Sequence, residues 1–79
     1  MVITATITDK TNAPRTRRQL KKQGFGYTRP LGMWVKNCMT IRGARLYLPA
    51  ARKIEGAEIT LRTVDEFHAL IDAASRKAA

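Results

Sequence analysis

The chain has 79 residues and a formal net charge of +9, from 15 Lys and Arg against six Asp and Glu. This length predicts a single domain over residues 1–79, whose core is too small to surround a deep active-site cleft. The charge is uneven, because residues 1–53 carry a net charge of +11 and residues 54–79 a net charge of −2. A one-sided positive field attracts polyanions, so the composition favours a binding protein over an enzyme.

The cysteine content and the N-terminal residues bear on location. Cys38 is the single cysteine, so no internal disulfide is expected and a reducing, intracellular setting fits the chain. The first ten residues have neither a basic segment nor an apolar run of the kind found in secretory signals. No stretch is apolar for long enough to span a membrane. We therefore expect a cytoplasmic protein that does not bind a membrane.

Residues 2–8 alternate between apolar and threonine side chains, which predicts a strand with Ile3, Ala5 and Ile7 on its buried face. A helix over residues 12–23 is predicted next. Pro14 suits the first turn of that helix, where a missing N–H is no loss, and Gly24 suits its C-terminal exit.

The predicted helix over residues 12–23 is strongly cationic. Its narrow apolar arc holds Ala13, Thr16, Leu20 and Gln23, and the opposite side carries five cations: Arg15, Arg17, Arg18, Lys21 and Lys22. These cations form two ridges, because Arg15, Arg18 and Lys22 project within about 60° of one another and Arg17 and Lys21 project about 40° apart. No Asp or Glu is interleaved to form i,i+4 pairs, which favours functional use of the cations over a merely solvated face.

A hairpin is predicted after this helix. Arg29 to Gly32 has proline and glycine at the positions preferred in a type I turn, so this segment joins residues 25–28 to a strand over residues 33–39. In that strand Met33 and Val35 share one face, and the other face carries Trp34, Lys36 and Cys38.

Residues 40–48 allow two interpretations. Their alternation favours strands on either side of Gly43 with Leu46 and Leu48 inward, whereas Thr40 could instead cap a short helix. Pro49 is expected to end this element, and residues 50–56 are expected to form a loop that bends at Gly56.

The C-terminal part predicts a strand over residues 57–62 and then an amphipathic helix. Thr63 and Glu66 form a capping box, and apolar side chains recur at helical spacing from Val64 to Ala74. Within this stripe we expect Phe67, Leu70 and Ile71 in the core, together with Ile3, Ile7, Ile59 and Leu61. The predicted fold class is α+β, a small, mostly antiparallel sheet with two helices packed on one face. Its predicted order is strand, helix, strand, strand, an optional strand, strand and helix.

The residues that catalysis or metal binding would need are scarce. His68 is the only histidine and Cys38 has no second cysteine, so neither a metal site nor a cofactor is expected. The acids after residue 54 fall at strand-surface, helix-cap and helix-surface positions rather than beside a base. Gly24 and Gly26 bracket Phe25 without the pattern of a phosphate-binding loop. We expect a protein without enzymatic activity.

Nucleic acid is the partner that the basic residues favour. Lys and Arg neutralise phosphates, and aromatic rings on the adjoining strands can stack on exposed bases. The predicted contact residues are Arg15, Arg17, Arg18, Lys21, Lys22, Tyr27, Arg29, Trp34 and Lys36. Tyr47 is a further aromatic candidate. Whether Trp34 and Tyr27 are core or contact residues is left open by the sequence, since a lone Trp in so small a domain is often a core residue.

One segment resembles a known family. The run from Arg17 to Phe25, with Leu20-Lys21 and Gly24 inside it, is followed by Trp34, and this pattern resembles a small domain of unknown function in plasmid and phage proteins. That family often occurs beside primase or helicase modules. It commonly has a second Trp shortly after the glycine, where this chain has Gly26 and Tyr27. The resemblance covers about a third of the chain and implies a mobile-element setting near nucleic acid, with no catalytic residues to transfer.

Three hypotheses follow from the sequence. The first is a non-enzymatic module that binds nucleic acid or a nucleoprotein complex through the cationic helix and the hairpin; the resemblance implies that it is of phage or mobile-element type. The second is a phage-encoded inhibitor of the anti-CRISPR kind that docks on an acidic surface of a nucleoprotein complex in the host cytoplasm. A third, a structural protein of the ribosome or another ribonucleoprotein, fits the charge, but such proteins usually have basic tails, whereas these termini are short and nearly neutral. The sequence leaves the choice among DNA, RNA and protein open, as well as the oligomeric state.

Overall fold

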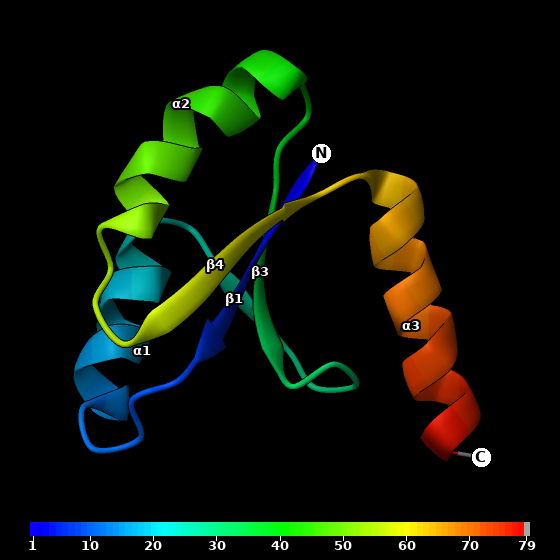
Figure 1. The fold of residues 1–79 in the computed structure, drawn as a ribbon, viewed down its shortest axis with the longest axis horizontal. Coiled ribbons are helices and arrows are strands. Elements are labelled where there is room, and N and C mark those ends of the chain that lie inside the picture. The colour runs from blue at the N-terminus through cyan, green and yellow to red at the C-terminus, as the bar shows by residue number, and fades with distance from the viewer. Residues whose placement is uncertain (79) are drawn as a thin grey trace.

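The computed structural model describes residues 1–78, with side chains described up to Arg76. Its elements in chain order are β1 (Val2–Ile7), α1 (Ala13–Lys22), β2 (Gly26–Thr28), β3 (Met33–Asn37), α2 (Ile41–Arg52), β4 (Ala57–Arg62) and α3 (Val64–Ala78). The four strands form one antiparallel sheet in the order β2-β3-β1-β4 (Figure 1). The predicted α+β class is confirmed, with three helices in the described residues rather than two.

The central strand β1 has two different faces. Ile3 and Ala5 are fully buried on the face that meets the helices α1 and α2, as the alternation predicted. Val2 and Thr4 are buried on the opposite face, where Thr4 accepts a hydrogen bond from Arg62 at 3.1 Å. Because β1 pairs with β3 on one side and β4 on the other, it holds the sheet together.

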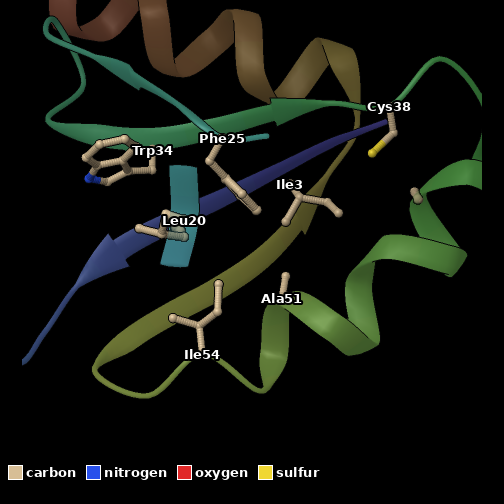
Figure 2. Packing of buried hydrophobic residues seen from close by; sticks show 9 residues of the cluster. Ile3, Leu20, Phe25, Trp34, Cys38, Ala51 and Ile54 are labelled. Carbon is tan, nitrogen blue, oxygen red and sulfur yellow. The ribbon is translucent and has the colours of Figure 1, made fainter. Parts of the chain in front are cut away.

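The hydrophobic core lies between the sheet and two helices. The helix α1 packs against β1, and α2 packs against β4 and β1. Figure 2 shows Ile3 of β1, Trp34 of β3, Leu20 of α1 and Ala51 of α2 meeting in one cluster with Phe25, Cys38 and Ile54 from the adjoining segments. Its buried members are Ile3, Ala5, Leu20, Phe25, Trp34, Cys38, Ala44, Ala51 and Ile54.

The helix α2 corrects the strand interpretation of residues 40–48. Thr40 caps the helix, since its Oγ1 accepts a hydrogen bond from the Gly43 amide at 3.0 Å. The helix buries the small side chains of Ala44 and Ala51 and leaves Leu46 exposed, although Leu46 was expected inward. Pro49 does not end the helix. It lies on the exposed side, where water can satisfy the carbonyl group that loses its amide partner to a proline.

The helix α3 also departs from the prediction. Its capping box is confirmed, because the Glu66 amide donates to Thr63 Oγ1 at 3.1 Å and the Glu66 carboxylate accepts from the Thr63 amide at 3.4 Å. However, Phe67, Leu70 and Ile71 are only half-buried and do not belong to the core cluster. Figures 1 and 2 place α3 on the opposite side of the sheet from α1 and α2. The expected core position of these three residues was therefore wrong, because α2 occupies that face.

Candidate nucleic-acid interface

The rotation of α1 decides where each of its cations points. Leu20 is fully buried in the core, and Thr16 is buried beside it. Thr16 Oγ1 donates to the Glu55 carbonyl oxygen at 3.1 Å, which ties α1 to the turn before β4. With this face fixed inward, Arg17 and Lys21 lie on one flank of the helix and Arg15 lies on the other.

The N-terminus of α1 is fixed by an acidic residue just before it. Asp9 accepts hydrogen bonds from the amides of Thr11 and Asn12 and from the Asn12 side chain. The side-chain hydrogen bond from Asn12, followed by the one from its amide, lowers the pKa of Asp9 below its ordinary value. Asn12 itself makes no side-chain cap, so the carboxylate of Asp9 organises the loop in its place.

The β2–β3 hairpin lies next to α1, and together they form the candidate site. Its turn is closed by the Gly32 amide, which donates to the carbonyls of Arg29 at 3.1 Å and Thr28 at 2.9 Å. Tyr27 and Trp34 face each other across the two strands, with ring centroids 5.4 Å apart and planes at 88°. The indole of Trp34 is 6% exposed, whereas Tyr27 is 53% exposed. Trp34 is therefore a core residue that supports Tyr27, and Tyr27 presents the accessible ring.

Two adjoining hollows lie between α1 and the hairpin and share Arg17, Tyr27 and Trp34; we name them together the cationic groove. The larger hollow has a volume of about 490 Å³ and is lined by Arg17, Lys21, Phe25, Gly26, Tyr27, Arg29 and Trp34. The smaller hollow, of about 280 Å³, is lined by Thr6, Ile7, Lys10, Ala13, Arg17, Tyr27, Gly32 and Trp34. No acidic side chain lines either hollow. The groove therefore combines cations from three segments with one exposed aromatic ring.

The structure brings together five of the nine predicted contact residues in the cationic groove: Arg17, Lys21, Tyr27, Arg29 and Trp34. Arg15 lines a separate hollow on the opposite flank of α1, where Asp9 and Glu55 stand beside Lys53. Arg18 and Lys22 are exposed on the outer side of the helix, between these two regions.

Lys36 is placed apart from the groove. Its ammonium group donates to the Gln23 carbonyl oxygen and lies 3.8 Å from the ring centroid of Tyr47. This cation and ring attract each other, and together they connect the end of α1 with α2. The predicted role of Lys36 in partner contact thus has less geometric support than a structural role.

Sequence reasoning missed several residues of this surface. Lys10 and Phe25 line the cationic groove, yet neither was predicted as a contact residue. Arg42, Arg45 and Arg52 are exposed on α2; they were overlooked because strands were favoured for residues 40–48 and a loop was expected for residues 50–56. The alternative of a helix capped by Thr40, which the structure confirms, places these arginines on an exposed helical face.

The groove is lined by cations and one exposed aromatic ring, together with apolar and small side chains. None of the residues that line it is an acid, histidine or cysteine. Among residues 1–78, no three His, Cys, Asp or Glu side chains lie close enough to hold a metal ion. None of the helices in this range is long and apolar enough to cross a membrane.

Comparison with known proteins found no family model, no curated protein and no solved structure that matches the chain.

Proposed function

We propose that this chain is a small, non-enzymatic module that binds nucleic acid through the cationic groove. The observation that supports this function is that Arg17, Lys21 and Arg29, from two separate elements, surround the exposed ring of Tyr27 without an acid among them. Such cations neutralise phosphates and release counterions, and an exposed ring stacks on an unpaired base. The resemblance of residues 17–34 to plasmid and phage domains supports a mobile-element setting.

The two flanks of α1 provide the test. Replacing Arg17 and Lys21 with Glu should weaken binding of a fluorescent oligonucleotide about tenfold or more, because both cations line the groove. Replacing Arg15 and Lys22 with Glu makes the same change in net charge outside the groove and should weaken binding less. Fluorescence anisotropy with single strands and duplexes of DNA and RNA measures the effect. Equal, negligible effects of both pairs would contradict the proposal.

Variants of Tyr27 separate the contribution of base stacking to affinity from the contribution of charge. Tyr27→Ala removes the ring, whereas Tyr27→Phe keeps it and serves as the matched control. If a base stacks on this ring, the alanine variant should bind single strands about tenfold more weakly, since stacking contributes about 1–3 kcal/mol per base. Duplex binding should change less in the same variant, because paired bases cannot reach the ring. Melting temperatures of both variants report whether the fold is retained.

A second function is favoured by a different surface. Met39, Ile41 and Leu46 are 97%, 60% and 72% exposed, and Arg42 and Arg45 stand between them. Arginines mixed with exposed apolar side chains are typical of protein interfaces. We infer a docking surface for an acidic protein of a nucleoprotein complex, as a phage-encoded inhibitor of the anti-CRISPR kind would use. Under this alternative, bare nucleic acid would not bind, and Leu46→Glu would abolish inhibition of the complex.

A further inference from the structure

The sheet ends in two unequal edges. β2 forms one edge with three residues, whereas β4 forms the other with six. Figure 1 looks onto the β4 edge, since β4 passes in front of β1 and β3 and the three helices lie to the sides. The molecule measures 33 × 33 × 15 Å, and its shortest dimension matches the roughly 14 Å that four strands span in the hydrogen-bonding direction. Within residues 1–78, no helix or loop backbone crosses in front of the β4 edge in this view.

Natural proteins protect long edge strands, and β4 has no lysine, proline or bulge; its two charged side chains, Glu58 and Arg62, are of opposite sign. Edges are commonly blocked by lysine, proline, a bulge or extreme shortness. The strand reads Ala-Glu-Ile-Thr-Leu-Arg and pairs with β1 in an unbroken register of six residues. An unprotected edge of this length is a template for another strand.

The hydrogen-bonding direction of each β4 residue follows from the register. Met1 and Cys38 exchange hydrogen bonds between their main-chain groups, so they form a hydrogen-bonded pair. Because such pairs alternate along an antiparallel ladder, the main-chain N–H and C=O groups of odd-numbered β1 residues point toward β3, and those of even-numbered residues point toward β4. The Thr8 amide, which donates to the Gly56 carbonyl at 2.8 Å, agrees with this alternation. Glu58, Thr60 and Arg62 therefore bond to β1, and the amides and carbonyls of Ala57, Ile59 and Leu61 point away from the sheet.

We propose that a second copy of this chain pairs its β4 with this edge, antiparallel, about a twofold axis at Thr60. In that register Ile59 lies opposite Leu61 of the second copy, and these two residues carry the outward main-chain groups. Both residues therefore form the hydrogen-bonded pairs that an antiparallel ladder requires. The pairing is closed and symmetric, so it makes a dimer rather than a fibre.

The charges of β4 select this register. With Thr60 on the axis, Glu58 lies opposite Arg62 of the second copy, and the symmetry repeats this pair at the other end. Both charges share the sheet face on the α3 side, at non-hydrogen-bonded positions where side chains are closest. If the axis shifts to Ile59 or Leu61, the carboxylate and the guanidinium no longer face each other. The strand is thus complementary to itself in one register, which favours a second copy over an unrelated strand.

The first experiment measures mass by light scattering during size-exclusion chromatography. The wild type should elute as a dimer, and Glu58→Arg should elute as a monomer because four arginines then face one another in pairs. Arg62→Glu alone should also be monomeric, whereas an equimolar mixture of the two variants should form a heterodimer with both charge pairs restored. Asp72→Arg makes the same charge change as Glu58→Arg on an exposed position of α3 and should remain dimeric.

The second experiment tests the register. Thr60→Cys places two thiols opposite each other across the axis, so mild oxidation should produce a covalent dimer on a non-reducing gel. Glu58→Cys is the control, because its thiol faces residue 62 of the second copy and should not cross-link. The native Cys38 is buried and stays reduced in both variants. A monomeric wild type, a dimer that Glu58→Arg leaves intact, or equal cross-linking of both cysteine variants would overturn the proposal.

Discussion

Gly56 shows how a single residue joins three segments of the chain. Its carbonyl accepts hydrogen bonds from the amides of Thr8 and Asp9, at 2.8 and 3.2 Å, so it fixes the end of β1. Its φ of +81° lies in the left-handed region, which glycine adopts without the strain of a Cβ. The side chains of Thr16 and Asp9 lie next to Gly56. The hydrogen bond from Thr16 to the neighbouring Glu55 carbonyl sets the rotation of α1.

Gly56→Ala should therefore destabilise the fold by about 1–3 kcal/mol, the range for a non-glycine residue held in an unfavourable backbone conformation. The added Cβ would also lie 3.0 Å from both the Asp9 Cβ and the Thr16 Oγ1. Gly26→Ala is the matched control, because its Cβ would meet no atom within 4 Å. Urea denaturation of both variants measures the difference. Equal losses would mean that the Gly56 turn has no special role.

At the scale of whole elements, the helices differ in how firmly they are held. The helix α1 contributes the fully buried Leu20, whereas no side chain of α3 described up to Arg76 is buried. Removal of apolar atoms lowers the free energy of unfolding most where the surrounding side chains cannot relax to fill the cavity. The two helices should therefore respond differently to the same substitution.

Leu20→Ala should cost about 2–5 kcal/mol, which approaches the entire stability of a domain of this size. Leu70→Ala removes the same atoms from a half-buried position and should cost about 1 kcal/mol, because less area leaves water there on folding. Thermal unfolding followed by circular dichroism compares the two variants. A larger loss for Leu70→Ala would show that α3, rather than α1, belongs to the main core.

The elements that the sequence predicted well are those with strong local signals. β1 alternates over its whole length, α1 has Pro14 and Gly24 at its ends, and α3 begins with a capping box. The helix α2 was predicted only as the alternative to strands, and the reason is physical. It contains Gly43 and Pro49, both unfavourable in helices, and it buries alanines, which give no contrast in hydrophobic periodicity.

The candidate site was predictable in composition but not in geometry. Periodicity alone separates Arg17 and Lys21 from Arg15 on α1. Which of these flanks faces the hairpin depends on the contact between Thr16 and the Glu55 carbonyl, which joins residues distant in sequence. No local pattern contains that information.

At the scale of the whole molecule, the basic and acidic segments of the sequence are also separated in space. The cations of α1 and α2 lie on one side of the sheet, while the acids of α3 lie on the other (Figure 1). β4 leads the chain from one side to the other, so the change of sign near residue 54 coincides with the change of layer. A polyanion is therefore attracted more strongly to the α1 side than to α3.

This separation predicts how salt should affect binding. Each phosphate contact contributes about 0.7 for single strands, or about 0.9 for duplex DNA, to the slope of log K against log salt concentration. Replacing Arg17 and Lys21 with Gln removes two such cations from the cationic groove, so the slope should flatten by about 1.4 to 1.8. The measurement is fluorescence anisotropy of a labelled oligonucleotide over a series of salt concentrations.

The matched control replaces Arg52 and Arg76 with Gln, which lowers the net charge by the same amount at exposed positions that do not line the groove. Because counterions are released only where cations meet phosphates, this control should leave the slope near its wild-type value. If binding depended only on the total charge of the protein, the two variants would instead lose affinity to the same extent. Equal slopes in these two variants would therefore locate the phosphate contacts outside the groove, even if the wild type binds tightly.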